Sequence, residues 1–455
     1  MEDLRHYLRE NRENYPDEFY EISETISPEY EITAWWDELS KFNSPILYFN
    51  SVKGYDLPVV ANIFGTIKRV ARMIGAEPHN IYDVWMEKVG KTVDPVIVDE
   101  GPVKEVKYMG PDVNVFNLPV LKFFREDGGR YITSGIVVAN DPETGVVNLS
   151  FARMVLKSPN KLGLSIHSRG NLWHYYQKAV RKGLPWLDVA VVIGCHPAIY
   201  LAAASRKIDE YRLAGALASS PVDLVKCETK EIYVPAHAEI VLEGRILTTV
   251  EEDEGPFSEF TGYVSGRSTR NVMQIDCITR RHDAIYHTII PSKSSEHLIL
   301  GGLPFHATVY SKLKESIPQV CGINFPLWGT HFVAVIAVDK QGKEGIQIRA
   351  ALRLIGEDPY AKYVIVVDSD VNVQDDFEVL WAVATRSQPH RDLHVVDLTD
   401  GSMLDPSQEK AGLTSRVVID ATRPPHMQNI PTPSIPIELA EKVRSKIFKK
   451  VPRNI

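Results

Sequence analysis

The stretch that decides the fold is VEEDEGPFSEFTGY, residues 250–263, near the middle of the chain. A run of four acids at 251–254 meets a Gly-Pro turn, and Phe257 and Phe260 then flank a fifth acid, Glu259. A solvated acidic loop has no need of two phenylalanines, so we expect the loop to fold back onto the body of the protein. Burial and mutual repulsion would raise the pKa values of inward carboxylates toward the range useful for proton transfer. An ordinary surface loop is the alternative interpretation.

The composition is that of an ordinary globular protein. The 455 residues are 44% hydrophobic and 24% charged, which allows two or three domains with proper cores. A net charge of −8 argues against nucleic-acid binding, because phosphate contacts need a basic face. No apolar run reaches the roughly 20 residues that cross a bilayer. Four scattered cysteines and a charged N-terminus without a signal-peptide pattern predict a cytoplasmic protein that does not insert into membranes.

The pattern of the chain predicts a mixed α/β (α+β) protein with three parts. Residues 1–110 form an N-terminal α/β region that begins with an amphipathic helix over 2–12. Residues 111–304 are rich in strands, and residues 305–455 alternate strands and helices as βαβ units do. The turn at 141–145 predicts a hairpin whose returning strand is VVNLSFARMVL. No G-x-G-x-x-G or Walker sequence opens a helix, so a standard nucleotide site is not indicated.

Polar residues on the returning strand and after it are candidates for a metal site. An Asn within a strand is disfavoured by propensity, so Asn148 is either a surface residue or has a specific partner. A bulge between Asn148 and Arg153 would place both in one pocket, whereas a half-exposed hairpin strand is the plainer interpretation. His167 and His174 flank a glycine turn, and Glu210 follows later. An amide oxygen, an imidazole and a carboxylate together suit Mn²⁺ or Mg²⁺ better than structural zinc.

Taken together, these segments closely resemble the UbiD family of prenylated-FMN-dependent decarboxylases. The resemblance spans roughly residues 50–425. The matching segments are NLSFAR (148–153), Glu210 in IDEY, VKCET (225–229), VPAHAEIVLEG (234–244), EGPFSEFTGY (254–263), YVIVVDSDVNV (363–373) and GLTSRVVIDAT (412–422). The resemblance implies that residues 111–304 form a split β-barrel that binds the flavin. It also implies a homodimer or hexamer, with an oligomerisation helix in the C-terminal part.

The resemblance also implies the cofactors and the residues that hold them. The expected cofactor is prenylated FMN, supplied by a flavin prenyltransferase, with Mn²⁺ (or Mg²⁺) and K⁺ at its phosphate. Asn148 and Glu210 correspond to metal ligands, and His167 is the preferred third ligand, although Asn171 and His174 stay open. The residues expected to contact the cofactor are Asn148, Ser150, Phe151, Ala152, Arg153 and Arg416.

The implied activity is reversible, non-oxidative decarboxylation of an aromatic or α,β-unsaturated carboxylic acid. Arg153, Glu254 and Glu259 match the family's catalytic network. Glu254 is the expected proton donor to the carbon that CO₂ leaves, and we expect burial and Glu259 to raise its pKa. The modified flavin is the electron sink, and whether substrate joins it by cycloaddition or by a single covalent bond stays open.

Two other functions are weighed against this one. A non-catalytic flavin-binding subunit of a larger (de)carboxylase would have no need to keep all three of Arg153, Glu254 and Glu259. An ordinary FMN reductase would not explain the acidic loop at 250–263. The sequence leaves the substrate open among hydroxybenzoates, other aromatic or heteroaromatic acids, and acyclic 2-enoic acids.

Overall fold

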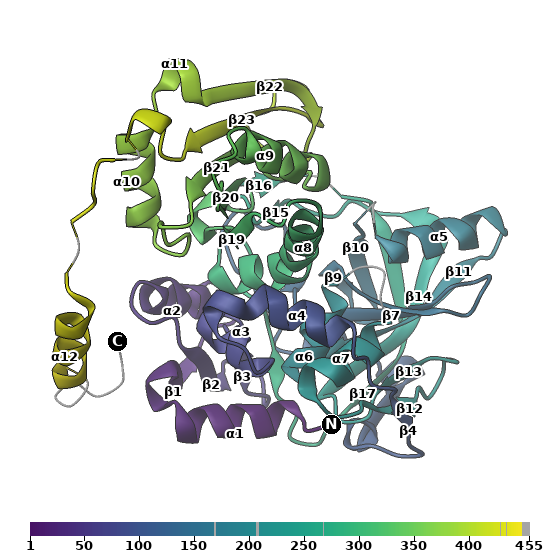
Figure 1. The fold of residues 1–455 in the computed structure, drawn as a ribbon. Helices are drawn as coiled ribbons and strands as arrows, with labels where there is room; N and C mark the ends of the chain where they lie inside the picture. Colours follow the sequence, from purple (N-terminus) through teal and green to yellow (C-terminus); the bar gives the residue numbers. More distant parts are fainter. Residues whose placement is uncertain (168–169, 206–208, 267, 428, 434, 448–455) are drawn as a thin grey trace.

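The chain forms three parts that pack together, as the computed structural model in Figure 1 shows. The N-terminal part is purple, the central part with its large sheet is teal, and the C-terminal part is green and yellow. The structure describes residues 1–447 apart from 168–169, 206–208, 267, 428 and 434. Residues 448–455 of the predicted C-terminal domain lie outside the described residues.

The N-terminal part is a small sheet with helices around it. Its strands follow the order β1-β2-β3-β18, so β18 reaches in from the central part. The predicted first helix is confirmed: Leu4, Tyr7 and Leu8 are buried on one side, and the Asp3 side chain caps it by accepting from the His6 N–H at 2.8 Å. The elements are α1 (Leu4–Asn14), β1 (Phe19–Ile26), α2 (Glu31–Ser40), β2 (Ile46–Val52), β3 (Val59–Ala61), α3 (Ile67–Met73) and α4 (Ile81–Val89).

The central part is built on a curled nine-stranded sheet. Its main path runs β6-β9-β10-β17-β14-β11-β7-β8, and β5 pairs with β17. The sheet and its mixed α/β surroundings agree with the predicted fold class. The elements are β4 (Val96–Ile97), β5 (Val106–Met109), β6 (Tyr131–Ile132), β7 (Ile136–Asn140), β8 (Val147–Phe151), β9 (Arg153–Ser158), β10 (Lys161–Ser165), α5 (Asn171–Arg181), β11 (Trp186–Ile193), α6 (Pro197–Ala203), α7 (Glu210–Ala218), β12 (Asp223–Lys226), β13 (Tyr233–Pro235), β14 (Ile240–Glu251), β15 (Phe257–Ser258), β16 (Val264–Ser265), β17 (Asn271–Arg280) and β18 (Tyr286–His287).

Strand β11 is apolar along most of its length because both of its faces are buried. Ala190 and Val192 point into the core that also holds helices α6 and α7. Val189 and Val191 point the other way, into the core inside the curl of the sheet. A strand with two buried faces reads as a continuous apolar run rather than an alternating one.

The chain changes partners at Ala152, which separates β8 from β9. Strand β8 pairs with β7, whereas β9 pairs with β6 and β10 at the other end of the sheet path. The single returning strand predicted from VVNLSFARMVL is therefore two strands. The break places Arg153 at the start of a new strand, two residues after the last residue of β8.

The C-terminal part is a five-stranded sheet with helices packed on it. Strands β20, β21 and β23 are parallel, which confirms the mostly parallel sheet predicted from βαβ spacing, and β19 and β22 are antiparallel at its edges. The elements are α8 (Ser295–Ser316), β19 (Val320–Asn324), β20 (Val333–Val338), α9 (Ile346–Glu357), β21 (Tyr363–Asp368), α10 (Asp376–Arg386), α11 (Pro389–Asp392), β22 (Leu393–Asp400), β23 (Leu413–Ala421) and α12 (Ile437–Ile447).

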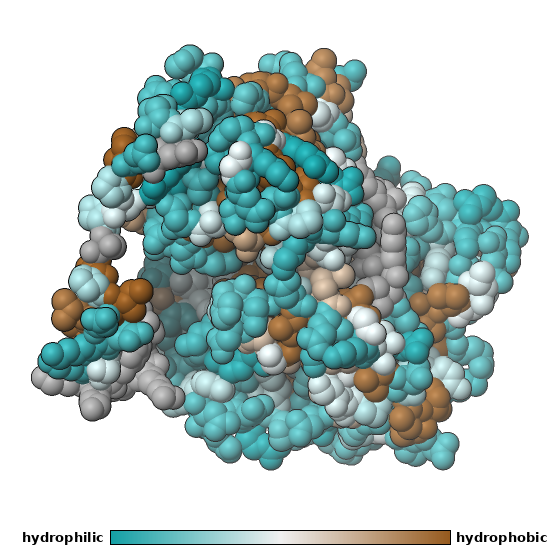
Figure 2. Space-filling view, in the orientation of Figure 1, coloured by the Kyte–Doolittle hydropathy of each residue, from teal (hydrophilic) through white to brown (hydrophobic). Residues whose placement is uncertain are grey.

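Helix α12 stands away from the rest of the chain (Figure 1). Its apolar side chains at Ile437, Leu439 and Val443 are exposed, and Figure 2 shows hydrophobic surface there. Among the described residues, none of the helices is both long and apolar enough to cross a membrane.

Candidate active site

Three charged side chains from distant parts of the chain meet beside the central sheet. The guanidinium of Arg153 holds Glu254 at two points, since Nε donates to Oε1 and Nη2 donates to Oε2, both at 3.0 Å. Its remaining nitrogen, Nη1, donates to Oε1 of Glu259. The side chains are 11% (Arg153), 0% (Glu254) and 13% (Glu259) exposed, so a cation between two acids is held largely out of water.

Local contacts hold the loop that carries both acids. The Asp127 carboxylate accepts from the Ser258 N–H at 3.0 Å and from its hydroxyl at 2.9 Å. The Gly128 N–H donates to the Pro256 carbonyl at 2.7 Å, and a Cβ on Gly128 would lie only 2.3 Å from the Gly255 carbonyl oxygen. The glycine therefore permits the close approach of the two chain segments.

Aromatic rings support the guanidinium from one side. The Arg153 guanidinium carbon lies 5.0 Å from the centre of the Phe257 ring, within the range of a cation–π contact. The Phe257 ring in turn packs against Tyr131 at 4.6 Å between ring centres. Phe257 is buried, so the predicted inward fold of this loop is confirmed at that residue.

The acidic run divides into an outer and an inner half. Glu252 pairs with Lys161 at 2.9 Å, and Asp253 pairs with Arg270 at 3.2 Å, near the surface. Glu254 is the next residue and points inward. Surface ion pairs of this kind contribute little to stability, but they neutralise the outer charges beside the buried one.

Burial controls the proton affinity of the site. It raises the pKa of the Glu259 carboxyl, although the Arg153 guanidinium opposes that shift, and Glu254 adds to it as a second negative charge. The two acids raise the pKa of Arg153 against the opposing effect of its burial.

Two of the three predicted metal ligands, Asn148 and Glu210, are both buried. Asn148 on β8 is buried, and its side-chain NH₂ donates to the Ser150 hydroxyl at 2.6 Å. Glu210, the first residue of α7, is buried with its carboxylate toward the backbone N–H of Leu149. Burial raises the pKa of Glu210 to about 8, and none of the described residues forms an ion pair with it. A buried carboxylate without a counter-charge, next to an amide, fits a divalent cation.

The preferred third ligand, His167, lies at the protein surface. His167 lies at the end of the segment after β10 and is exposed, and the next residues, 168–169, are outside the described part. The Gly170 N–H donates to the His167 carbonyl at 2.9 Å, which starts the turn into α5. Within the described residues, no group of three His, Cys, Asp or Glu side chains could hold a metal ion.

The other predicted cofactor contacts lie on or next to β8. Ser150 shares the Asn148 side of the strand, as their hydrogen bond shows. Phe151 packs against Tyr200 at 6.0 Å between ring centres, and Ala152 is the buried residue at the strand break. Ser150 therefore shares the side of β8 that carries Asn148, whereas Phe151 packs on the other side, toward α6.

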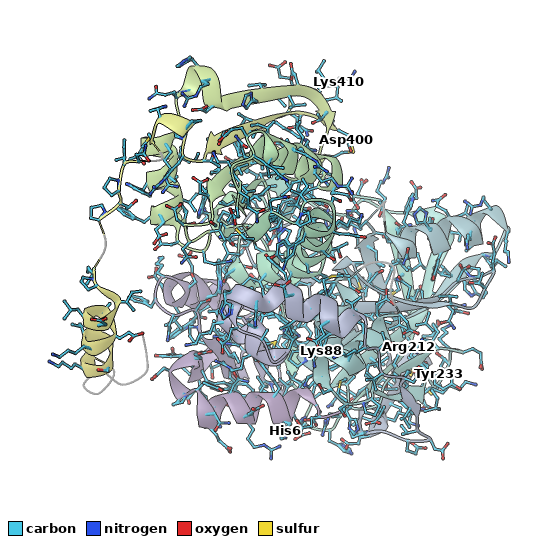
Figure 3. The ribbon with its side chains drawn as sticks, viewed as in Figure 1. His6, Lys88, Arg212, Tyr233, Asp400 and Lys410 are labelled. Carbon is cyan, nitrogen blue, oxygen red and sulfur yellow. The ribbon has the colours of Figure 1, made fainter. Side chains whose placement is uncertain are left out.

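Arg416 lies in the C-terminal part, where it binds backbone carbonyls. Its guanidinium is buried and donates to the carbonyls of Asp358 at 2.7 Å and Ala361 at 2.6 Å. It also donates to the Asp400 carbonyl and the Thr399 hydroxyl of β22, and Figure 3 shows Asp400 at the end of that strand. These donors hold backbone of the C-terminal sheet together, and the contact of Arg416 with a flavin phosphate stays a prediction.

Sequence reasoning missed Asp127 and Tyr131. Both lie in FREDGGRY, which reads as a surface turn because of its charges and paired glycines. Gly128 could have indicated this contact, because a glycine beside an acid often marks a place where two backbone segments approach closely.

The family of the chain follows from comparison with known proteins. Three family models, for the N-terminal, Rift-related and C-terminal domains of 3-octaprenyl-4-hydroxybenzoate carboxy-lyase (UbiD), match residues 14–89, 96–294 and 298–421. The chain belongs to the UbiD family. The UbiD match therefore covers all three parts of the fold described above.

Individual relatives agree over nearly the whole length. Anhydromevalonate phosphate decarboxylase of Methanothermobacter thermautotrophicus is 33% identical over 387 residues, which is 83% of this chain and 88% of that protein. The structure of the UbiD-class enzyme HmfF from Pelotomaculum thermopropionicum in complex with FMN is 34% identical, with a TM-score of 0.92 over 98% of this chain and 100% of that one. An evolved dimeric form of HmfF in complex with prFMN is 33% identical, with a TM-score of 0.87 over 100% and 99%.

Proposed function

We propose that this protein is a prenylated-FMN-dependent carboxy-lyase that reversibly decarboxylates an aromatic or α,β-unsaturated carboxylic acid. The observation that carries the proposal is the Arg153 guanidinium held between Glu254 and Glu259 in a buried site. The family match and the FMN and prFMN complexes of HmfF support the cofactor. Intact acids on both sides of Arg153 argue against a subunit that binds flavin without catalysis.

Each residue of the site has a chemical role in the proposal. Arg153 orients the substrate carboxylate while it keeps the two glutamates from repelling each other. Glu254 delivers the proton to the carbon that has lost CO₂, and Glu259 holds the other end of the Arg153 guanidinium. In the carboxylation direction the same groups take the proton away. When bound, the prenylated flavin supplies the electron sink for the carbon–carbon bond that breaks.

The cofactor is proposed to lie along β8. Asn148 and Glu210 would hold Mn²⁺ or Mg²⁺, whose charge balances the flavin phosphate against the Glu210 carboxylate. Ser150, Phe151 and Ala152 would contact the flavin between the metal and Arg153. K⁺, and a histidine or Asn171 as the third metal ligand, remain predictions from the family resemblance.

The test of the catalytic role is Glu254→Gln. We expect the variant to bind FMN like the parent protein but to lose CO₂ release by about 10²–10⁴-fold, because it has no proton to deliver. Turnover is measured with protein reconstituted with prenylated FMN and a panel of aromatic and enoic acids. Glu252→Gln is the matched control, because it changes a neighbouring acid that pairs with Lys161 outside the site. Full activity in Glu254→Gln would remove this residue from the role.

The metal site is tested by thermal stability, without turnover. Mn²⁺ added to the FMN-loaded protein should raise Tm by several degrees, because a ligand that binds only the folded state stabilises it. Glu210→Gln and Asn148→Ala should abolish this increase, whereas Glu143→Gln on the surface turn before β8 should keep it. An unchanged response to Mn²⁺ in both site variants would exclude these ligands.

A further inference from the structure

A cavity of about 250 Å³ lies between the N-terminal helices, α8 and the C-terminal part. Its walls are mainly apolar, and among the described residues that line it only Asp376 carries a formal charge. Representative lining residues are Ile67, Tyr82, Leu303, His306, Phe325 and His331. A cavity of about 150 Å³ already holds a benzene molecule, so this volume suffices for one substituted ring.

The cavity is joined to the catalytic loop by aromatic contacts. The ring of His331 lies 5.3 Å from that of Phe260, the residue after Glu259. Phe260 also packs against Phe332 at 5.9 Å and against Tyr360 at 6.0 Å. His331 is therefore both a wall of the cavity and a neighbour of the loop that carries the two acids.

Two imidazoles face the cavity without protein partners. His306 stacks flat on Phe325, with 3.7 Å between ring centres and 4° between planes, and lies 5.2 Å from His331. Among the described residues, neither imidazole has a hydrogen-bond partner. Buried polar groups are normally hydrogen-bonded, so an unpartnered pair on a cavity wall indicates a ligand that supplies the partner.

The backbone is arranged to bring the two imidazoles together. A Cβ on Gly302 of α8 would lie 2.6 Å from Cε1 of His306 and 2.7 Å from Cε1 of His331, so only glycine leaves room for both. Thr330 and His331 have φ values of 44° and 68°, which are unusual for residues with side chains. Backbone held in such a conformation is often found at binding sites.

Both imidazoles are neutral at physiological pH. Burial lowers the pKa of His331 to about 3 and holds that of His306 well below its ordinary value. A neutral imidazole donates one hydrogen bond and accepts another, which suits a hydroxyl group. It offers no charge to a second carboxylate or a phosphate, whose burial here would be costly.

We propose that His306 and His331 form the neutral hydrogen-bonding wall of the substrate site. The substrate is then a monoanionic aromatic acid that carries an uncharged hydrogen-bonding substituent, such as a phenolic hydroxyl. Its carboxylate faces Arg153, and its hydroxyl faces the two imidazoles. The inference rests on the proposed decarboxylase function and narrows its substrate class against acids with a second anionic group.

The experiment measures binding to the full-length, FMN-loaded protein by calorimetry. The ligands are benzoate, 3- and 4-hydroxybenzoate, and terephthalate, which replaces the 4-hydroxyl by a carboxylate. The hydroxybenzoate that binds better should bind about fivefold tighter than benzoate, because it makes one more hydrogen bond. It should bind at least about tenfold tighter than terephthalate, whose second carboxylate would be buried without a counter-charge. Terephthalate binding as tight as the hydroxybenzoates, or no binding by any of the four, would overturn the inference.

Variants test whether the imidazoles cause the tighter binding of hydroxybenzoate relative to benzoate. His306→Phe keeps the stacking on Phe325 and removes only the ring nitrogens, so the hydroxyl preference should fall to about twofold or less. His306→Gln should restore part of the preference, and His394→Phe on the exposed strand β22 should leave it intact. A preference that survives in His306→Phe contradicts the proposal.

Turnover separates this inference from the proposed function. If the hydroxyl preference is found but protein loaded with prenylated FMN releases no CO₂ from any of the acids, the decarboxylase proposal fails and the binding site stands. If CO₂ is released fastest from acids with a second anion, the decarboxylase proposal stands and this inference fails.

Discussion

At the scale of single residues, Arg153 determines the geometry of the site. Its planar fork meets both oxygens of Glu254, which a single ammonium group cannot do. The remaining nitrogen reaches Glu259, so one side chain fixes the relative position of two acids. The site therefore uses two properties of Arg153 that can be tested separately, its positive charge and the planar shape of its guanidinium.

Arg153→Lys tests the requirement for shape. It keeps the positive charge but loses the two-point contact, so we expect turnover to fall on the order of 100-fold through misplaced acids. CO₂ release by the reconstituted variant measures this, and circular dichroism checks that it is folded. Arg270→Lys, which changes only the outer pair with Asp253, should behave like the parent protein. Near-parental turnover in Arg153→Lys would mean that charge alone suffices.

The sequence supported some residue-level predictions and not others. The phenylalanines of the acidic loop indicated an inward fold because apolar rings beside a turn need a place to pack, and Phe257 is buried. A basic residue in TSRVVIDAT gave no such guidance, because an arginine binds backbone carbonyls as readily as a phosphate. Whether the Arg416 guanidinium points into the sheet depends on the carbonyls of Asp358 and Ala361, more than 50 residues earlier.

At the scale of elements, α8 is the link between all three parts. Its second residue, Glu296, is fully buried and accepts from the backbone N–H groups of Asn62 at 3.0 Å, Phe64 at 3.3 Å and Ile290 at 3.2 Å. Burial raises the pKa of Glu296 to about 7, although these N–H groups and the nearby Arg69 oppose the shift. This carboxyl therefore fixes the start of α8 against the N-terminal sheet.

The raised pKa of Glu296 predicts a pH dependence of stability. Below about pH 4.5 the carboxyl is protonated in both folded and unfolded chains, so it contributes no slope. As pH rises from about 4.5 to about 7, only the unfolded chain ionises, and stability should fall by up to about 3 kcal/mol.

Urea unfolding at pH 5 and pH 7.5 measures this slope. Glu296→Gln should flatten it, whereas Glu315→Gln, exposed on the same helix, should leave it unchanged. A slope that is the same in the parent protein and in Glu296→Gln would show that Glu296 is not its source.

Element types were more predictable from sequence than element boundaries. The βαβ alternation predicted the parallel strands β20, β21 and β23, since buried parallel strands and amphipathic helices have distinct periods. The division of one predicted strand at Ala152 was not visible, because both halves keep a strand-like pattern. Only the partners differ, β7 on one side of the break and β10 on the other, and pairing partners leave no local signal.

At the scale of the whole molecule, α12 and α10 present exposed apolar side chains. Ile437, Leu439 and Val443 are exposed on α12, and Phe377 and Leu380 are exposed on α10. Figure 1 shows α12 on its own at the end of an extended segment. A helix whose apolar side chains are exposed among the described residues is typical of one that packs against another copy.

We therefore expect a dimer or larger assembly that depends on α12. Light scattering after size-exclusion chromatography should give a mass at least twice that of one chain. The double variant Ile437→Glu and Leu439→Glu should shift it to the monomer, because two charges cannot be buried in an apolar contact. Glu441→Lys on the same helix is the control and should keep the assembly. A monomeric parent protein, or an unaltered mass in the double variant, would contradict the expectation.

Phe260 lies among rings of the C-terminal part, while the residue before it holds Arg153. The ring that packs against the C-terminal part and the acid that binds Arg153 are thus consecutive along the backbone. Selection for a new substrate by altering position 260 would also displace an acid of the reaction. Under the proposed function, the site would then acquire new specificities more readily through His306, which lies on the separate helix α8.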